Sequence, residues 1–395
     1  MTHEPLDDLL ERAGDEGRVA AEARAWPVAR EAFSQRPPAH LRRSRPPVAA
    51  LAAAGVAIVI ALLAASSPGA AVAHWLRDQI VGRPGVHHSA PALTHLPGGG
   101  RLLISAPQGV WVVNPDGSRR LLAGYAGATW SPRGLYIGVW RGRELSAVEP
   151  GGRVHWSLAR SHPIRAADWS PDGFRVAYLS GRTLRVVAGD GTGDVRLRAR
   201  VADVAPAWRP DAPHLLALGS RPKTVDVVAT DVDGLVWRAR LPQAVRGLSW
   251  SADGRLLAVV QRTRVTILGG ASGRVRTTLS APAGMTVGAA AFAHNGARVA
   301  LVFRSATRPS RAATVDLSAP GTPRRGLFTG TGRFSQVNWS PDDRWILISW
   351  PPADQWLFLR STRVSAVSAV GNIAAQFDPG KRRARFPAIS GWCCG

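Results

Sequence analysis

Trp169-Ser170-Pro171-Asp172-Gly173, followed by the apolar run 175–179, is the stretch of sequence on which the fold depends. The same phrase, an aromatic residue, then a turn and an apolar run, recurs at steps of 39, 39, 42, 42, 47 and 38 residues. Short strands and turns repeated with a period of about 40 residues are typical of β-propeller blades. The seven aromatic residues are Trp130, Trp169, Trp208, Trp250, Phe292, Trp339 and Phe377.

Each residue type in the phrase has a structural reason. Proline presets φ for a turn, aspartate accepts a hydrogen bond from the backbone two residues on, and glycine supplies a positive φ. The large aromatic residue suits the gap between neighbouring blades. We therefore expect these residues to be structural and not catalytic. Besides the aromatic residues, the structural set contains Asp172, Gly173, Asp253, Gly254 and Asp342.

A second turn phrase falls midway in most repeats, as at Asn114-Pro115-Asp116-Gly117. Two turns at constant phase imply hairpins, and so about four strands per repeat. The sequence predicts an all-β fold over 95–395, a propeller of about seven four-stranded antiparallel blades. The apolar runs after the first turn are expected to be inner strands, because they are apolar throughout. These runs are 102–105, 135–140, 175–179, 215–218, 256–260, 299–303 and 345–349.

The two ends of the repeat region carry weaker signals. Leu96-Pro97-Gly98-Gly99-Gly100 is a faint copy of the turn phrase, 34 residues before the first clear one. The segment 385–392 has the composition of one more strand. We expect it to pair with the first blade and close the ring, which removes an exposed sheet edge.

The phrases at Trp130, Trp169, Trp250 and Trp339 resemble the WD40-like (PD40) repeats of TolB-type propellers. The resemblance covers about 290 residues and is specific for the fold. The chain as a whole is similar to membrane-anchored propeller proteins of actinobacterial type. The resemblance implies that the propeller binds a protein partner in the cell envelope, an analogy that the fold alone does not establish.

The segment 48–67 contains no charged residue, and its twenty residues match the thickness of a bilayer core. Arg42, Arg43 and Arg45 precede it, so the N-terminal side is expected to be cytoplasmic and the propeller extracytoplasmic. The predicted division is a cytoplasmic tail at 1–47, a transmembrane helix at 48–67, a linker at 68–94 and the propeller at 95–395. The alternatives are a signal peptide cleaved near 71–73 and a buried soluble helix.

The charge of the chain is strongly positive and unevenly placed. The formal net charge is +23. Basic and acidic residues balance within 1–47, so the excess lies in the rest of the chain. Such a charge attracts polyanions, which include acidic lipids and cell-wall polymers. We expect an unidentified envelope protein or anionic polymer as partner and not nucleic acid, and the alternative is a solvated basic surface without a dedicated partner.

The motifs of common enzymes are absent from the sequence. It has no G-x-S-x-G elbow and no phosphate-binding loop. His87-His88 lies in a Gly- and Pro-rich segment without a nearby third ligand, and Asp231 and Asp233 fit a turn better than a calcium loop. We therefore predict no catalytic, cofactor-binding or metal-binding residues, and no cofactor.

The two cysteines, Cys393 and Cys394, are adjacent and close to the C-terminus. They cannot form a disulfide framework, so fold stability must come from core burial. A vicinal bridge, an intermolecular disulfide and two free thiols all remain open for this pair.

Three functions follow from these features. The preferred one is a non-enzymatic envelope scaffold or sensor whose extracytoplasmic propeller binds a protein or anionic polymer. The second is a propeller enzyme, such as a glycosidase or lyase, which needs two carboxylates that converge at the ring centre. The third is a membrane regulator whose tail holds a sigma-type factor.

Overall fold

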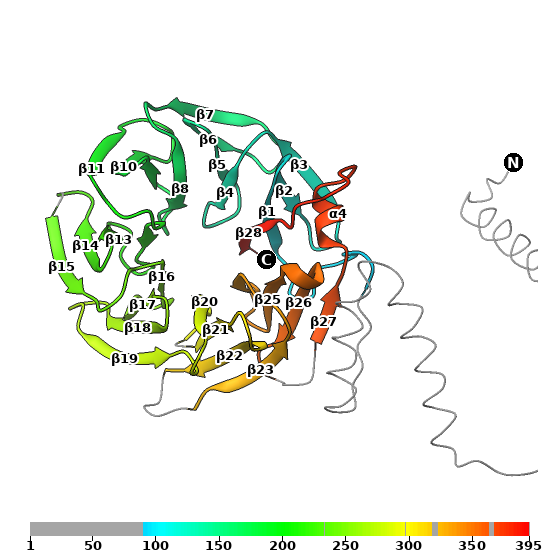
Figure 1. Ribbon diagram of the computed structural model, residues 1–395. Coiled ribbons are helices and arrows are strands. Elements are labelled where there is room, and N and C mark those ends of the chain that lie inside the picture. The colour runs from blue at the N-terminus through cyan, green and yellow to red at the C-terminus, as the bar shows by residue number, and fades with distance from the viewer. Residues whose placement is uncertain (1–89, 233, 297, 318–322, 363–366, 395) are drawn as a thin grey trace, which may run out of the picture. The chain divides into compact units, whose positions relative to one another are not determined.

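The computed structural model describes residues 90–232, 234–296, 298–317, 323–362 and 367–394. In these residues seven four-stranded antiparallel sheets stand in a ring (Figure 1). The predicted all-β propeller of seven blades is therefore confirmed. The expected tail at 1–47, the helix at 48–67 and the linker up to residue 89 lie outside the described residues. Within the described residues, no helix is long and apolar enough to cross a membrane.

The blades are numbered along the chain, and their strands are given from the ring centre to the rim. Blade 1 consists of β28 (Ala388–Cys393), β1 (Arg101–Ala106), β2 (Gly109–Val113) and β3 (Arg119–Ala123). Blade 2 consists of β4 (Gly127–Trp130), β5 (Ile137–Arg141), β6 (Glu144–Val148) and β7 (Val154–Ala159). Blade 3 consists of β8 (Ile164–Trp169), β9 (Arg175–Ser180), β10 (Thr183–Ala188) and β11 (Val195–Arg198).

The other four blades follow the same order. Blade 4 consists of β12 (Ala207–Trp208), β13 (Leu215–Arg221), β14 (Thr224–Ala229) and β15 (Gly234–Arg240). Blade 5 consists of β16 (Gly247–Trp250), β17 (Leu256–Val260), β18 (Arg264–Gly269) and β19 (Val275–Ser280). Blade 6 consists of β20 (Thr286–Phe292), β21 (Arg298–Arg304), β22 (Ser310–Asp316) and β23 (Arg325–Gly330). Blade 7 consists of β24 (Val337–Trp339), β25 (Trp345–Trp350), β26 (Gln355–Arg360) and β27 (Val367–Val370).

The apolar runs form the second strand of each blade, an inner strand with a neighbour on each side. In blade 3, for example, β9 lies between β8 and β10. Its residues 176–180 are all buried, because neighbouring blades cover both faces of the sheet. The innermost strand is the short segment that ends in the aromatic residue of the turn phrase, as β8 ends at Trp169.

The ring closes as predicted, because the last strand pairs with the first blade. β28 is antiparallel to β1, with Trp392 opposite Leu102. β28 lies at the centre of the ring, beside the end of the chain marked C (Figure 1). Closure through strands from both ends of the repeat region pairs the edge of β1 that would otherwise be exposed and completes blade 1.

Phe377 does not occupy the position that its spacing predicted. It ends the short helix α4 (Ile373–Phe377), between the last strand of blade 7 and the closing strand. There it is fully buried and packs edge-on against Trp111, with ring centroids 5.9 Å apart. Trp392, at the end of β28, is the aromatic residue of blade 1 instead.

The hydrophobic core lies between the blades and not within any one of them. One cluster joins Trp237 of blade 4 to Trp250 and Leu257 of blade 5. Another joins Trp392 of blade 1 to Trp356 and Phe358 of blade 7. Each blade therefore depends on its neighbours to bury its apolar faces.

Candidate functional site

The turn phrases are held by hydrogen bonds to their own aspartates. In blade 3, Ser170 Oγ donates to Asp172 Oδ1 at 2.5 Å, and the backbone N–H of Phe174 donates to the same oxygen at 3.0 Å. Gly173 follows with a φ of 79°. Asp253 of blade 5 and Asp342 of blade 7 accept the corresponding pairs of bonds, and Gly254 has a φ of 64°. Each of these carboxylates uses its Oδ1 to hold its own turn.

The aromatic residues link one blade to the next. The indole Nε1 of Trp208, Trp250 and Trp339 each donates, at 3.0 Å, to a backbone carbonyl of the preceding blade. The accepting residue in each case comes directly before that blade's own aromatic residue. Trp130 and Trp169 have a buried Nε1 without a partner among the described residues, and Phe292 has no donor to offer. The aromatic set is thus a ring of inter-blade contacts.

Among the described residues of the innermost strands, which surround the ring centre, Asp168 is the acidic one. It is half-buried on β8, and its Oδ2 lies 3.5 Å from the backbone N–H of Trp208. Burial raises the pKa of Asp168 to about 7, although N–H groups of Trp208 and Trp169 act in the opposite direction. One carboxyl alone does not make the acid–base pair that glycoside cleavage requires.

The two ends of the propeller differ in charge. One end carries the hairpins between the second and third strands of each blade together with the connections between blades, and we name it the hairpin face. The other end carries the aromatic turn phrases, and we name it the motif face. Because neighbouring strands are antiparallel, each connecting segment belongs to one of these faces by topology.

In the described connecting segments, the hairpin face has thirteen basic and three acidic residues, and the motif face has seven basic and ten acidic ones. The basic residues of the hairpin face are Arg143, Arg160, Arg182, Arg200, Lys223, Arg246, Arg262, Arg308, Arg333, Lys381, Arg382, Arg383 and Arg385, and the acidic ones are Asp203, Asp354 and Asp378. The motif face has Arg133, Arg153, Arg209, Arg255, Arg274, Arg324 and Arg344 against Asp116, Glu149, Asp172, Asp190, Asp194, Asp211, Asp231, Asp253, Asp342 and Asp343.

Most of the positive charge on the hairpin face has no acidic partner. Of the thirteen basic residues, Arg160 alone forms an ion pair within the described chain, with Asp194 at 2.6 Å. The turn phrases explain the opposite balance at the motif face, because the turns themselves need aspartate. The excess positive charge of the propeller connections therefore belongs to one face.

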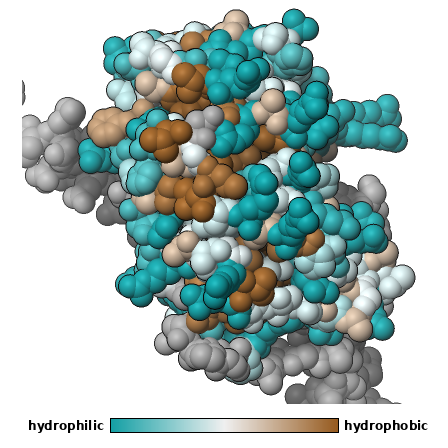
Figure 2. Space-filling view, turned by 90° about the vertical axis from the view of Figure 1, so that its left-hand side faces the viewer, coloured by the Kyte–Doolittle hydropathy of each residue, from teal (hydrophilic) through white to brown (hydrophobic). Residues whose placement is uncertain are grey.

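The rim of the propeller is mixed in character. Figure 2 views it edge-on, from the side of β11 and β15, and shows apolar side chains that interrupt a mostly hydrophilic surface. Exposed apolar residues at these strands include Val195, Val232, Leu235 and Val236. Singly exposed apolar residues are normal on protein surfaces, so this view alone indicates no partner.

A pocket of about 540 Å³ opens between blades 2 and 3, among residues near the motif face. This volume is within the range of small-molecule sites. Its lining is rich in aromatic side chains and was not predicted, because the lining comes from segments of two blades. The lining residues are Tyr136, Ala147, His155, Trp156, Trp169, Gly173, Phe174, Ala188, Gly189 and Asp190.

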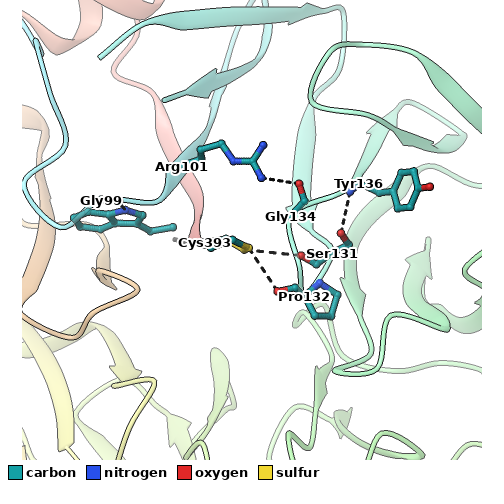
Figure 3. The surroundings of a disulfide bond; sticks show 9 residues. Gly99, Arg101, Ser131, Pro132, Gly134, Tyr136 and Cys393 are labelled. Carbon is teal, nitrogen blue, oxygen red and sulfur yellow. Dashed lines mark hydrogen bonds between the residues drawn. A yellow bond between two sulfur atoms is a disulfide. The ribbon is translucent and has the colours of Figure 1, made fainter. Parts of the chain in front are cut away.

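Cys393 and Cys394 form a disulfide with each other in the structure. Figure 3 shows that the end of β28 lies beside the turn phrase of blade 2, with Cys393 near Ser131 and Pro132. Next to it, the guanidinium of Arg101 donates to the carbonyl of Gly134 at 2.7 Å. The pair therefore lies where the closing strand meets the following blade.

The residues considered for metal binding give no metal site in the described chain. No group of three or more His, Cys, Asp or Glu side chains is placed to hold an ion among those residues. Asp231 Oδ1 accepts the backbone N–H of Val232 at 3.0 Å, as a turn residue does. His87, His88 and Asp233 lie outside the described residues.

No protein-family model and no curated protein sequence matches this chain. Solved structures do match. They include Kuenenia stuttgartiensis hydrazine synthase (TM-score 0.52, 15% identity, 61% of this chain and 78% of that chain) and the Cps50 (Swd1) β-propeller domain of Myceliophteria thermophila (0.50, 16%, 63% and 87%). A chain of the mitotic checkpoint complex matches with a TM-score of 0.56 and 17% identity, over 71% of this chain and 93% of that one. At these identities the likeness shows the β-propeller fold alone.

Proposed function

We propose that the protein is a non-enzymatic scaffold of the TolB-like type, anchored in a cell membrane through 48–67, whose extracytoplasmic propeller binds an anionic partner. The observation that carries the proposal is the charge of the hairpin face, with thirteen basic against three acidic residues in its connecting segments. Unpaired positive charge on one side of a molecule attracts polyanions and steers their approach.

The arrangement of these charges favours a linear polymer over a compact anion. Successive hairpins of blades 2 to 6 each carry one basic side chain, so the charge follows the ring and does not gather in one pocket. These side chains are Arg143, Arg182, Lys223, Arg262 and Arg308. An extended anionic polymer, such as one with a phosphodiester backbone, can contact several hairpins at once and release counterions at each contact.

The test is binding of long-chain polyphosphate to the full-length protein in a non-ionic detergent. Arg143, Lys223 and Arg262 are exposed, and their side chains form no hydrogen bond or ion pair with described residues. Their triple replacement, R143E/K223E/R262E, should weaken binding by more than about tenfold, and the affinity of the unaltered protein should fall steeply with added salt.

The matched control is R133E/R274E/R276E, which changes the net charge equally at and near the motif face. Arg133, Arg274 and Arg276 are also exposed and without such partners in the described chain. This control variant should keep most of the affinity for polyphosphate. Equal losses in both variants, or binding that does not depend on salt, would leave only a general charge effect and contradict the proposal. Preference for an acidic protein over polyphosphate would also contradict the choice of polymer.

A propeller enzyme of the glycosidase or lyase type is the second candidate, and Asp168 is the observation in its favour. A half-buried carboxyl with a pKa of about 7 resembles a general acid. Release of sugar fragments from envelope polysaccharide, abolished by Asp168→Asn, would establish this activity. We favour binding, because Asp168 has no second carboxylate beside it on the described innermost strands.

A further inference from the structure

The interface that holds the pocket, between blades 2 and 3, can be compared with the interface between blades 4 and 5, where an arginine lies over the corresponding tryptophan. In blade 2, Trp156 of β7 donates its Nε1 to the carbonyl of Gly189 in blade 3 at 2.7 Å. In blade 4, Trp237 of β15 makes the same bond to Gly270 of blade 5 at 2.8 Å. The two interfaces are therefore built on one plan.

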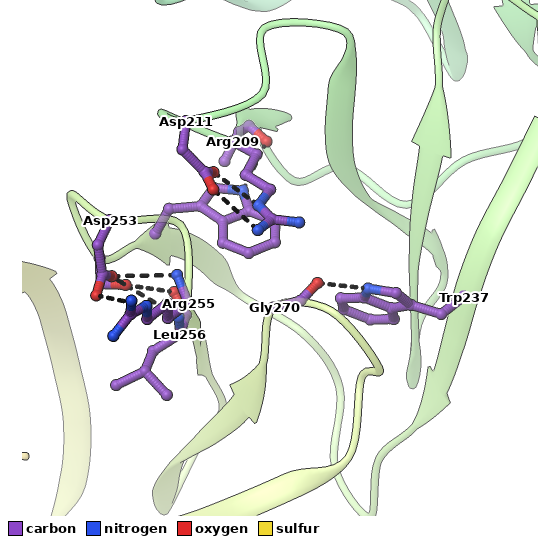
Figure 4. Close-up of polar contacts among 10 residues, drawn as sticks. Arg209, Asp211, Trp237, Asp253, Arg255, Leu256 and Gly270 are labelled. Carbon is purple, nitrogen blue, oxygen red and sulfur yellow. Dashed lines mark hydrogen bonds and ion pairs between the residues drawn. The ribbon is translucent and has the colours of Figure 1, made fainter.

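In the interface between blades 4 and 5, which we name the closed interface, side chains of the turn phrase of blade 4 lie against Trp250 and Gly254 of blade 5. Arg209 pairs with Asp211 at 2.7 Å and lies over the ring of Trp250, 5.8 Å from its centroid. The carboxylate of Asp211 reaches so close to Gly254 that a Cβ there would lie 1.8 Å from Oδ1. Figure 4 shows the Arg209–Asp211 pair beside the Trp237–Gly270 contact, and Trp237 is only 7% exposed.

In the open interface, the corresponding positions of blade 2 hold Ser131 and Arg133. Ser131 is buried and its Oγ accepts a bond from the backbone N–H of Tyr136, within its own turn. Beside Gly173, which corresponds to Gly254, the nearest atom to an added Cβ is Cδ of Pro132 at 3.8 Å. No arginine covers Trp169, so the space of about 540 Å³ stays empty in the described chain.

The walls of this pocket are aromatic. Tyr136 and His155 meet edge to face, with ring centroids 4.7 Å apart, and Trp156 and Trp169 complete the lining. Phe174 also lines the pocket and is 74% exposed, so its ring is available to cover a ligand. Faces of aromatic rings carry a negative potential that attracts cations.

Asp190 is the acidic residue of the pocket lining, and Glu149 lies behind His155. Asp190 Oδ1 accepts bonds from the N–H and hydroxyl of Thr192, which leave Oδ2 without a partner among the described residues. Those bonds hold the pKa of Asp190 below its usual value. Glu149 pairs with Arg153 and lies 3.0 Å from His155 Nε2. The hydrogen bonds from Arg153 and His155 lower the pKa of Glu149 to about 2. Both carboxyls are thus charged at neutral pH. Arg153 pairs with Glu149, whereas Asp190 has no ion-pair partner among the described residues.

We propose that the pocket between blades 2 and 3 binds a small organic cation with an apolar body, its charge held by Asp190 and the aromatic walls. The pocket takes a ligand where the closed interface takes the guanidinium of Arg209, which is itself a cation over a tryptophan ring. The site lies away from the hairpin face, so this proposal is independent of polyanion binding.

The test uses benzyltrimethylammonium as probe and titration calorimetry on the full-length protein in a non-ionic detergent. We expect saturable binding that weakens about tenfold in Asp190→Asn and in Phe174→Ala, the loss expected for a charge partner or one aromatic wall. Asparagine preserves the turn, and Phe174 is exposed, so neither change endangers the fold. The double variant S131R/R133D, which copies the closed interface, should abolish binding.

The control is Leu135→Ala, which removes another exposed apolar side chain outside the lining and should bind as the unaltered protein does. Equal binding of neopentylbenzene, the uncharged isostere, would show an apolar site and overturn the proposal. Preferential binding of methyl glucoside or benzoate, or affinity unchanged in Asp190→Asn and Phe174→Ala, would overturn it as well.

Discussion

Six tryptophans and one phenylalanine lie at or next to the ends of the innermost strands. The indole N–H groups of the six tryptophans are not equivalent. Trp339 Nε1 donates to the carbonyl of Ala291, whereas Trp169 Nε1 is buried without a described partner. Replacement of either residue by phenylalanine removes a similar volume, but only Trp339→Phe also breaks a hydrogen bond. We expect Trp339→Phe to lower the free energy of unfolding by about 1 kcal/mol more than Trp169→Phe. Urea unfolding of the two variants measures the difference, and equal losses would show that the inter-blade bond contributes nothing.

Asp168 predicts a pH dependence at the same scale. Its pKa is raised from 3.8 to about 7 in the folded protein, so between these values the folded state binds more protons than the unfolded one. Stability from this group is therefore lost as pH rises through that range, and the loss is complete above it. Asp168→Asn should be less sensitive than the unaltered protein to a change from about pH 5 to about pH 8. Thermal unfolding at both pH values tests this, and parallel shifts in the two proteins would contradict the raised pKa.

At the scale of the elements, the turn phrases predicted the number of blades. The aromatic residue of the blade that closes the ring was harder to identify. The turn phrases are local, and Asp172, Asp253 and Asp342 each accept hydrogen bonds from within their own phrase. Blade 1 is divided between the two ends of the repeat region, so its aromatic residue does not precede its turn in the sequence. Trp392 supplies it, and its Nε1 donates to Gly99, within the faint phrase before β1, at 2.8 Å.

Phe377 mimics the missing aromatic residue because a Pro-Gly turn follows it at a similar interval. The innermost strands were not located from the sequence, because they are only two to seven residues long and carry little pattern of their own. The pocket between blades 2 and 3 depends on which side chains of one blade reach the next. That information is absent from the spacing of the repeats. The sequence does show that one position of the phrase holds Arg209 in blade 4 and Ser131 in blade 2.

The closing strand gives the prediction for this scale. Trp392 is 5% exposed and packs between blades 1 and 7, where its ring meets Phe358 at a centroid distance of 5.8 Å. Trp392→Ala should cost about 3–5 kcal/mol of unfolding free energy, the cost of a large cavity in a core. Leu135→Ala, at a position 60% exposed, is the control and should change stability little. A small loss for Trp392→Ala in urea unfolding would mean that the ring does not rely on this strand.

At the scale of the whole molecule, the uneven charge has a consequence for stability that does not depend on any ligand. Twelve basic residues on the connections of the hairpin face have no ion-pair partner in the described chain, so they repel one another in the folded ring. Salt screens this repulsion, since the screening length falls from about 30 Å at 0.01 M to about 3 Å at 1 M. Sodium chloride should therefore raise the melting temperature of the full-length protein.

The charge variants of the hairpin and motif faces locate the repulsion. R143E/K223E/R262E should melt higher than the unaltered protein at low salt and respond less to added chloride, because it places acidic groups among the crowded basic ones. R133E/R274E/R276E lowers the net charge by the same amount but adds acid to a face that already has an excess of it, so its melting temperature should not rise. Identical salt responses in the two variants would show that net charge alone governs stability, and the division of the propeller into a basic and an acidic face would then have no energetic meaning.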